Sequence, residues 1–388
     1  MTSIKTVRIA IIVGEPSGDQ LAAKLMPALE ERFAPVSIQW SGVGGERMAK
    51  LGFHSQFPLA DIAVMGFLPV LGRLRVVLRR IRETAQAIIS LKPDILVIID
   101  SPDFTHRVAK RVRGALPDLP VVDYVSPSVW AWRSGRAAAM RQYVDHVLAL
   151  LPFEPGVHKR LGGPDCTYVG HPLIERLAEL RPSRSEIELR EGLPLRLVVL
   201  PGSRKSEIRR LMPIFGLTVE RLLKMGVEPF EILLPAVDHL RDEIEQMSRS
   251  WLVKPTLVFG EESKLAAFRT ARAALAASGT VTLELALSGV PMVVAYQVSF
   301  FEGQLRHVIR VPSIVLPNLI LGRNVIPEHI QGECNPVQLA NSLLPLLTSG
   351  PERNDQIAAF EELDQRMATG TQSPSELAAN IIAGLLNR

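Results

Sequence analysis

The sequence contains little cysteine, few aromatic residues and no long apolar run. Its two cysteines, Cys166 and Cys334, form neither a CxxC pair nor a zinc-type spacing, so both are expected to be core thiols of a protein from a reducing compartment. Aromatic residues make up 5% of the chain and are scattered, which argues against a stacking surface for nucleic acid. Because no apolar stretch reaches the roughly 18 residues of a spanning helix, any membrane contact is expected to be peripheral.

Motifs for metal binding and for secretion are also missing. The sequence has no HExxH motif, no Asp-x-Asp pair and no cluster of His and Cys residues, so neither a metal nor a cofactor is expected. The apolar run Val7–Val13 is too short for a signal peptide and lacks an A-x-A cleavage site. It predicts instead the first β-strand of a cytoplasmic protein. The formal charge of +4 permits an anionic partner without selecting one.

Short β-branched runs alternate with longer helical patterns along the chain. This alternation predicts an α/β fold, in which helices cover both faces of parallel sheets. Helices such as Leu21–Arg32 and Phe104–Arg113 are expected between the strands. The expected strands are Val7–Val13, Val36–Trp40, Ile95–Ile99, Val121–Tyr124, His146–Leu150, Leu195–Leu200, Phe230–Leu234, Thr256–Phe259, Ala273–Ala276 and Met292–Tyr296.

A chain of 388 residues exceeds the size at which one hydrophobic core stops growing, so two domains are expected. The strand pattern stops after Val169–Pro172, gives way to the polar stretch Arg181–Glu186, and restarts at Leu195. We therefore expect one domain over residues 1–172 and a second over residues 173–345. Residues 346–388 predict a tail of helices without a strand, which is expected to pack back on an N-terminal domain.

The first strand leads into a glycine-containing loop, Gly14–Asp19, at the edge where open parallel sheets bind ligands. Gly14 and Gly18 allow the backbone to approach a ligand, but a simple capped turn explains the spacing equally well. Farther along, Gly42–Arg47 superficially resembles a dinucleotide fingerprint, but Arg47 stands at the third glycine position. We interpret that segment as a loop, with a plain tight turn the more economical explanation.

Asp100 follows the strand Ile95–Ile99 and begins the sequence Asp-Ser-Pro-Asp. A carboxylate at the carboxyl end of a strand is suited to act as a general base on a sugar hydroxyl. Asp103 is explained as the cap of the next helix, whereas capping explains Asp100 less well. Asp100 is therefore the expected base.

Two loops in the second half favour an anionic ligand. Pro201–Arg204 combines a glycine, a hydroxyl and a guanidinium at the start of a helix, which favours diphosphate binding over a solvated basic helix face. Ser278–Thr280 offers small and hydroxyl residues after another strand. Glu284, one turn inside the following helix, is placed to accept hydrogen bonds from a ribose, although a capping role with Thr280 or Thr282 fits equally well.

The segment Val64–Arg82 is apolar and rich in arginine, which suits contact with the surface of an anionic bilayer. A helix packed on the sheet with a basic outer face is an equally good interpretation. The residues expected to contact the membrane or acyl chains are Met65, Phe67, Leu68, Leu71, Arg73 and Arg75.

Taken together, these segments resemble the bacterial lipid-A-disaccharide synthases across nearly the whole chain. The Ser-Pro-Ser-Val-Trp-Ala-Trp string is the most specific element of the resemblance. The segments that carry it are Gly14–Asp19, Pro93–Phe104, Tyr124–Trp132, Leu150–Glu154, Val169–Pro172, Leu200–Arg204, Ala277–Thr280 and Pro317–Leu319. The resemblance implies a GT-B architecture, with two facing Rossmann-like lobes and a helical C-terminal tail.

The family resemblance also implies the chemistry. A UDP-linked 2,3-diacylglucosamine would be joined to 2,3-diacylglucosamine 1-phosphate by an inverting glycosyltransferase that releases UDP, at the cytoplasmic face of the inner membrane. Asp100 would be the base, and Arg204 would stabilise the leaving diphosphate. The other implied donor contacts are Ser203, Ser278, Gly279, Thr280, Glu284 and Asn318. The residues implied for the cleft and the acceptor are Glu15, Ser17, Gly18, Asp19 and Ser126.

Departures and alternatives remain. Val281 and Gln297 differ from the residues usual in this family, so Gln297 is left out of the phosphate site. The same two lobes also fit an epimerase acting on UDP-N-acetylglucosamine, another lipid-linked-sugar transferase, or a non-catalytic sugar-binding protein. The apolar, arginine-rich segment argues against an epimerase, and the missing signal peptide argues against a sugar-binding protein. The sequence does not distinguish a monomer from a homodimer, and it gives no role to His171.

Overall fold

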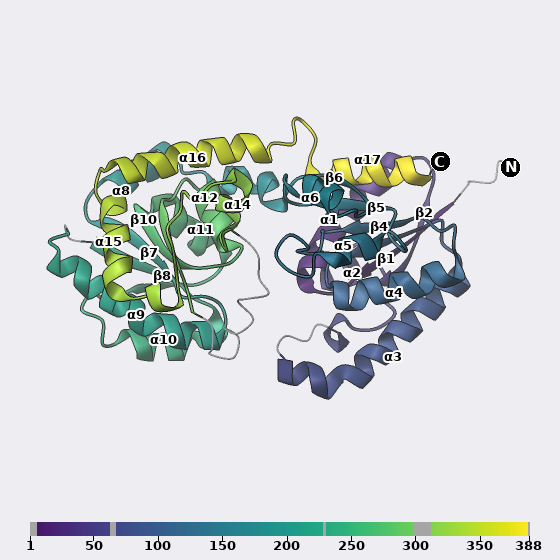
Figure 1. Ribbon diagram of the computed structural model, residues 1–388, viewed down its shortest axis with the longest axis horizontal. Helices are drawn as coiled ribbons and strands as arrows, with labels where there is room; N and C mark the ends of the chain where they lie inside the picture. Colours follow the sequence, from purple (N-terminus) through teal and green to yellow (C-terminus); the bar gives the residue numbers. More distant parts are fainter. Residues whose placement is uncertain (1–5, 63–66, 228–229, 298–311, 387–388) are drawn as a thin grey trace. The chain divides into compact units, whose positions relative to one another are not determined.

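The computed structural model describes residues 6–62, 67–227, 230–297 and 312–386, without the side chains of residues 67–73 (Figure 1). The chain divides into two compact units. Unit 1 consists of Met1–Pro172 together with Thr369–Arg388, and unit 2 consists of Leu173–Ala368. Each unit is built around its own parallel sheet.

Unit 1 contains a six-stranded parallel sheet with the order β2-β1-β3-β4-β5-β6. Its strands are β1 Val7–Val13, β2 Ile38–Val43, β3 Ile95–Ile99, β4 Val121–Tyr124, β5 His146–Ala149 and β6 Asp165–Tyr168. Its helices in the described residues are α1 Pro16–Phe33, α2 Glu46–Ala49, α3 Phe67–Leu91, α4 Pro102–Ala115, α5 Gly135–Met140, α6 Glu154–Arg160 and α17 Pro374–Leu386, with the 3₁₀ turn η1 Leu59–Asp61.

The two faces of this sheet carry separate cores because successive side chains of a strand point in opposite directions. Ile9 and Ile11 of β1 pack with α1 and α17 on one face. Ala10 and Ile12 pack with α3 and α4 on the other. Figure 1 shows α3 and α4 on the side of this sheet opposite α17. A strand that is buried on both faces needs a continuous apolar run, and this requirement explains the sequence of β1.

Unit 2 repeats this design with the strand order β12-β11-β10-β7-β8-β9. Its strands are β7 Leu195–Leu200, β8 Phe230–Pro235, β9 Thr256–Val258, β10 Ala273–Ala277, β11 Met292–Tyr296 and β12 Glu328–Ile330. Its described α-helices are α7 Leu177–Leu180, α8 Arg184–Glu191, α9 Lys205–Lys224, α10 Arg241–Ser248, α11 Glu261–Thr270, α12 Val281–Leu287, α14 Leu316–Leu321, α15 Pro336–Leu347 and α16 Pro351–Met367. Short 3₁₀ turns are η2 Pro172–Arg176, η3 Asp238–Leu240 and η5 Gln331–Glu333.

The strand order locates the edge at which each unit is suited to bind a ligand. In unit 1 the chain leaves β1 toward β2 and returns to place β3 on the other side of β1, so the loops after β1 and β3 diverge. In unit 2 the loops after β7 and β10 diverge in the same way. Ligands of open α/β sheets bind at such points, at the carboxyl ends of the strands.

The segment expected to form a helical tail is shared between the units. Helix α16 packs against α14 and α12 of unit 2. Helix α17 lies along α1 of unit 1, where Arg32 Nε donates to Asn380 Oδ1 over 3.0 Å. Residues 346–368 therefore belong to unit 2, and residues 369–388 belong to unit 1.

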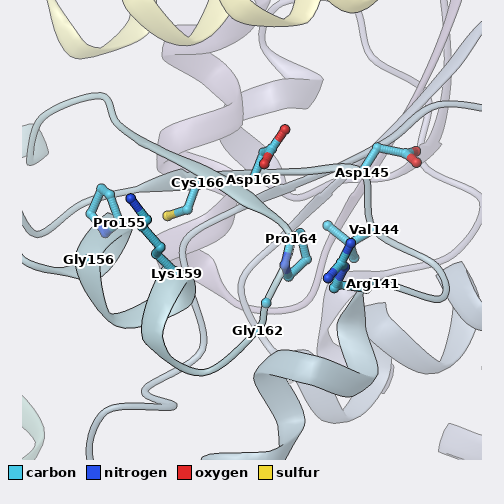
Figure 2. A pocket seen from close by; sticks show the side chains of 11 residues that line it. Arg141, Val144, Asp145, Pro155, Gly156, Lys159, Gly162, Pro164, Asp165 and Cys166 are labelled. Carbon is cyan, nitrogen blue, oxygen red and sulfur yellow. The ribbon is translucent and has the colours of Figure 1, made fainter.

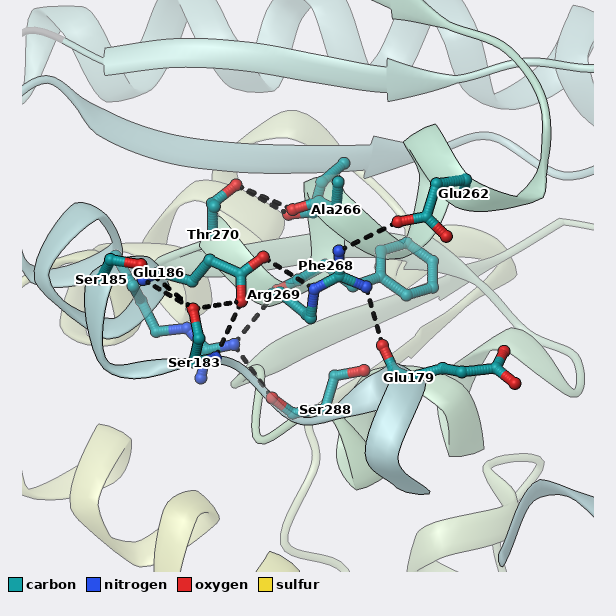
Figure 3. A network of polar contacts seen from close by, with 12 residues as sticks. Glu179, Ser183, Ser185, Glu186, Glu262, Ala266, Phe268, Arg269, Thr270 and Ser288 are labelled. Atoms are coloured by element: carbon teal, nitrogen blue, oxygen red, sulfur yellow. Dashed lines mark hydrogen bonds and ion pairs between the residues drawn. The ribbon is translucent and has the colours of Figure 1, made fainter. Parts of the chain in front are cut away.

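Polar contacts fix the first helices of unit 2. Arg269 of α11 donates from Nε to Glu186 Oε1 over 2.7 Å and from Nη1 to the carbonyl of Glu179 over 2.7 Å (Figure 3). Arg190 of α8 donates to the carbonyls of Phe268, Gly289 and Ser288. These contacts hold the entry segment α7–α8 against α11.

The predicted fold class is confirmed by the two helix-covered parallel sheets. Five strands, β1, β3, β4, β7 and β11, have the predicted bounds. The second strand was placed too early, because Gly42 continues β2 beside Ile11 instead of beginning a loop. Within the described residues, no helix has the length and apolar character needed to cross a membrane.

Candidate active site

Asp100 stands at the carboxyl end of β3 on a sharply turned backbone. Both Asp100 and Ser101 have left-handed conformations, with φ of 58° and 46°. Such conformations are costly for residues other than glycine and persist only where the surroundings hold them. Here the Asp100 N–H donates to the carbonyl of Tyr124 over 3.2 Å, and Thr105 Oγ1 donates to the carbonyl of Asp100 over 2.7 Å. The turn makes room for the Asp100 carboxylate at the sheet edge before α4 begins.

The first turn of α1 binds this carboxylate directly. Ser17 Oγ donates to Asp100 Oδ2 over 2.7 Å, and the Ser101 N–H donates to Asp100 Oδ1 over 2.7 Å. Close packing depends on Gly14, since a Cβ atom there would lie 2.1 Å from Cβ of Ser101. The structure therefore brings Ser17 and Asp100 together at the edge of the sheet.

Glu15 is the second carboxyl group at this edge. Burial raises its pKa above the usual value, and the neighbouring charge of Asp100 raises it further. Two carboxyl groups with different environments are a common arrangement where one must accept a proton. Glu15 therefore takes up a proton more readily than an exposed glutamate does.

Three other residues predicted for this region serve the framework in the structure. Asp19 is buried, and its oxygens accept from the backbone N–H groups of Gly45, Arg47 and Met48. It thus caps α2, although the family resemblance implied a place for it in the acceptor cleft. Ser126 is buried with its Oγ 2.8 Å from Nε2 of His158. Gly18 packs closely on β3, where a Cβ atom would lie 3.2 Å from the carbonyl oxygen of Ile99.

Unit 2 contains a pocket of about 650 Å³ at its own switch point, between the loops after β7 and β10. The predicted donor residues Ser203, Arg204, Ser278, Gly279 and Thr280 all line it. The other lining residues are Leu200, Gly202, Glu207, Pro235, Ala236, Val237, Asp238, Val258, Gly260, Glu261, Lys264, Ala277 and Val281. The structure therefore gathers these five predicted residues at a single hollow.

In the loop after β7, the groups suited to bind an anion already bind a carboxylate of the protein. Glu207 Oε2 accepts from the N–H groups of Ser203 and Arg204, over 3.2 and 3.3 Å. The Arg204 guanidinium donates to Glu207 Oε1 over 2.8 Å, and its side chain is 68% exposed. Gly202 permits this approach, because a Cβ atom there would lie 2.4 Å from Glu207 Oε2. Glu207 therefore lies where an anionic ligand would bind.

Lys264 of α11 is a pocket cation that sequence reasoning missed. Its Nζ lies 2.9 Å from Glu284 Oε2 and 2.9 Å from Glu261 Oε2. Burial opposes the charge of Lys264, but the two carboxylates outweigh that effect and raise its pKa. No sequence pattern pointed to this residue, because its partner Glu284 is distant along the chain. Glu284 is held by Lys264 and does not itself line the pocket.

Asn318 and Gln297 stand outside the pocket wall. Asn318 is buried, donating to the carbonyl of Ile326 and to Glu328 and accepting from two backbone N–H groups. This set of bonds gives it a framework role. Gln297 Nε2 donates to the carbonyl of Cys334 over 3.4 Å. His171, at the end of unit 1, is partly buried, and burial lowers its pKa to about 4.

Another hollow, of about 720 Å³, lies in unit 1 beside α5, α6 and β6 (Figure 2). Its lining includes Asp145, which directly precedes β5, and Asp165, the first residue of β6. It therefore opens at the amino ends of these strands, away from Asp100. The Asp145 carboxylate accepts hydrogen bonds from Arg113 and from the N–H of Val121. The position of this hollow argues against a role for it in a reaction at Asp100.

The segment expected to contact a membrane forms the beginning of α3. Met65 lies outside the described residues, as do the side chains of Phe67, Leu68, Leu71 and Arg73. Arg75 and Leu74 are exposed. In the described residues, no group of three or more His, Cys, Asp or Glu side chains is arranged to hold a metal ion.

Several solved structures are similar to this chain in fold, and two of them contain UDP or UDP-GlcNAc. S. aureus MnaA in complex with UDP matches with a TM-score of 0.62 at 14% identity, over 98% of this chain and 97% of that one. The Neisseria meningitidis UDP-GlcNAc 2-epimerase bound to UDP-GlcNAc gives 0.57 at 12% identity, over 99% and 100%. MurG from Acinetobacter baumannii gives 0.60 at 14% identity, over 97% and 99%. These likenesses confirm the GT-B fold.

Sequence relatives are much closer. The lipid-A-disaccharide synthase of Nitrobacter winogradskyi is 55% identical over 97% of this chain and 94% of that protein. Those of Rhodopseudomonas palustris strain HaA2 and Bradyrhizobium diazoefficiens are 52% and 51% identical, each over 98% of this chain and 97% of the relative. A family model described as lipid-A-disaccharide synthetase matches residues 9–382. The chain therefore belongs to the lipid-A-disaccharide synthase family of glycosyltransferases.

Proposed function

We propose that this member of the family transfers 2,3-diacylglucosamine from its UDP-linked donor to 2,3-diacylglucosamine 1-phosphate, with release of UDP. The observation that carries the mechanism is the Asp100 carboxylate at the switch point of unit 1, held by Ser17 Oγ at 2.7 Å. Asp100 accepts the proton of the acceptor's 6-hydroxyl as that oxygen attacks the anomeric carbon of the donor. Attack occurs on the face opposite the departing UDP, so the anomeric configuration is inverted.

The donor's diphosphate binds in the unit 2 pocket. Arg204 turns from Glu207 to the diphosphate and stabilises the charge that develops on the leaving group. The backbone of Ser203 and of Ser278–Thr280 lines the same hollow and offers polar groups to the phosphates. Lys264 supplies a second cation, and its ion pair with Glu284 holds it beside the pocket.

Both substrates carry acyl chains, so the protein works at the surface of the inner membrane on its cytoplasmic side. The exposed Arg75 and Leu74 on α3 support this part of the proposal, since a basic and apolar surface is attracted to anionic lipid. Binding to vesicles that contain anionic phospholipid, compared with vesicles of neutral lipid alone, tests the contact. Equal binding to the two kinds of vesicle would contradict it.

The decisive experiment supplies the purified protein with the diacylated UDP-glucosamine and the diacylated glucosamine 1-phosphate. Formation of the disaccharide is measured by mass, and release of UDP is measured separately. We expect one disaccharide for each UDP. Release of UDP without a new glycosidic bond would overturn the proposed transfer.

Two variants separate the two units' roles. Asp100→Asn should lower kcat by about 10²–10⁴-fold, the range typical of a general base, and leave UDP affinity unchanged. Arg204→Ala should weaken UDP binding, measured by calorimetry. Retained turnover in the Asp100 variant would remove that residue as the base, and unchanged UDP affinity would remove Arg204 from the donor site.

A further inference from the structure

We propose that Arg133 and Arg136 form the subsite that binds the 1-phosphate of the acceptor. The inference rests on the proposed function, because it concerns a sugar 1-phosphate as the acceptor. Both arginines approach one carboxylate oxygen of unit 1. Arg136 Nη2 lies 3.3 Å from Asp103 Oδ1, and Arg133 Nη1 lies 3.9 Å from the same atom.

Asp103 balances only part of the charge of this cluster. One carboxylate faces two guanidinium groups, and the Asp103 side chain is 72% exposed, so the ion pairs are weak and readily exchanged. A phosphate monoester carries more negative charge and three acceptor oxygens. It can engage both guanidinium groups, whose planar arrays of donors suit phosphate geometry. Phosphate is therefore a better partner for the two arginines than Asp103.

The neighbouring Trp132 orders these side chains before any ligand binds. The Arg133 guanidinium lies 4.4 Å from the centre of the Trp132 ring system, and that of Arg136 lies at 5.9 Å. Stacking on an indole limits the motion of an arginine without using its hydrogen-bond donors. Arg133 also has a left-handed backbone, with φ of 51°, a conformation that its surroundings must hold.

Buried contacts fix the segment that carries this cluster. Trp130 Nε1 donates to Glu154 Oε1 over 3.1 Å, and the Trp130 and Phe153 rings meet edge to face at 5.4 Å. Ser126 Oγ lies 2.8 Å from Nε2 of the buried His158. These contacts attach Ser126 and Trp130, which precede the two arginines along the chain, to α6. Ser126 thus positions the loop, which gives this predicted acceptor residue an indirect part in acceptor binding.

The cluster is at the edge of the sheet that carries the base. Asp103 lies in the first turn of α4, three residues after Asp100. In a glucosamine 1-phosphate, the 6-hydroxyl and the 1-phosphate are attached on the two sides of the ring oxygen, so they lie at the same end of the sugar. An acceptor whose 6-hydroxyl reaches Asp100 therefore places its 1-phosphate near the two arginines that pair with Asp103.

Two acceptors separate phosphate recognition from a general structural effect. The transfer rate is measured with 2,3-diacylglucosamine 1-phosphate and with 2,3-diacylglucosamine that has a free 1-hydroxyl. For Arg133→Ala and Arg136→Ala we expect kcat/KM for the phosphorylated acceptor to fall by about 10- to 100-fold, as for loss of hydrogen bonds to a charged group. The rate with the unphosphorylated acceptor and the affinity for UDP should change little. A variant that only distorts the loop would lower both rates together.

Arg141→Ala is the matched control, since Arg141 lies just after α5 and lines the hollow at the opposite edge of the sheet. It should keep the wild-type preference for the phosphorylated acceptor. If the wild-type protein forms disaccharide but the Arg133 and Arg136 variants keep that preference, the phosphate subsite is wrong and the proposed function stands. If the wild-type protein forms no disaccharide, the proposed function fails, and this inference fails with it.

Discussion

Ser17 donates a hydrogen bond from its hydroxyl group to the Asp100 carboxylate over 2.7 Å, which joins the first turn of α1 to the end of β3. This bond has a direct consequence for turnover, because it orients the carboxylate that we propose as the base. Replacement by alanine leaves the backbone of the loop unchanged. It removes one of the two hydrogen bonds that the structure gives to the Asp100 carboxylate oxygens.

Ser17→Ala is therefore expected to lower kcat by about 10-fold, the effect of losing one hydrogen bond to a charged group, with UDP affinity unchanged. Steady-state kinetics and calorimetry with UDP measure the two quantities. Ser17→Thr, which keeps a hydroxyl group, is the control and should restore most of the activity. An alanine variant with wild-type kcat would show that the bond has no part in catalysis.

A substitution at Gly14 is expected to have a large steric effect beside Asp100. A methyl group on Gly14 would lie 2.1 Å from Cβ of Ser101, so Gly14→Ala must displace Ser101 and the Asp100 carboxylate beside it. Overpacking of this kind typically costs about 1–3 kcal/mol. We expect a lower unfolding free energy in urea together with a large loss of turnover.

Gly114→Ala provides the matched control for that substitution. Gly114 lies in α4, and a Cβ atom there meets nothing within 4 Å. Alanine is favoured over glycine inside a helix, so this variant should gain about 0.5–1 kcal/mol and keep its activity. Similar behaviour of the two variants would contradict the tight contact between the loops.

Glu207 is expected to compete with UDP for the same hydrogen-bond donors in the unit 2 pocket. Its carboxylate accepts from the N–H groups and the guanidinium that we assign to the diphosphate, so UDP must displace it. Glu207→Gln removes the competing negative charge, and we expect UDP to bind about 3- to 10-fold more tightly, with a small loss of stability from the weaker helix cap. Calorimetry and thermal unfolding check the two effects. Glu220→Gln, on the same helix, should change neither, and weaker UDP binding by the Glu207 variant would refute the competition.

The sequence was sufficient to predict the inner strands and both switch-point loops. Strands such as β1 and β7 are buried on both faces and form continuous apolar runs, which are easily recognised. The edge strands β6, Asp165–Tyr168, and β12, Glu328–Ile330, were missed because short edge strands are polar and depend on their neighbours. Gly42 was taken for part of a loop, because glycine usually interrupts a strand.

The candidate site was predictable where it depends on local sequence and not where it depends on distant partners. Asp100 and Arg204 follow strands directly, so their position at a sheet edge could be inferred. Asp19 and Asn318 have the same polar character, yet the structure uses their side chains to hold other loops. Lys264 became recognisable only through its contact with Glu284, 20 residues farther along the chain.

The lowered pKa of Glu186 is expected to make the stability of unit 2 depend on pH in the acid range. Burial alone would raise its pKa, but hydrogen bonds from Arg269 and Ser183 outweigh burial and lower the pKa to about 2 (Figure 3). A carboxyl group whose pKa is lower in the folded state stabilises the fold above its unfolded pKa. That contribution is lost as the pH falls from about 4.5 to about 2.

We expect Glu186→Gln to reduce the acid sensitivity of unit 2. Because solvent screens part of the interaction, the contribution lost is about 1–2 kcal/mol. Urea unfolding at pH 7 and pH 3 measures it, and the difference between the two pH values should be smaller in the variant. Glu188→Gln is the control, since Glu188 pairs with the exposed Arg184 on the same helix and should keep the wild-type difference. Arg269 lies on α11 with the pocket residue Lys264, so the Glu186 variant should also bind UDP more weakly if the α8–α11 contacts hold that helix in place.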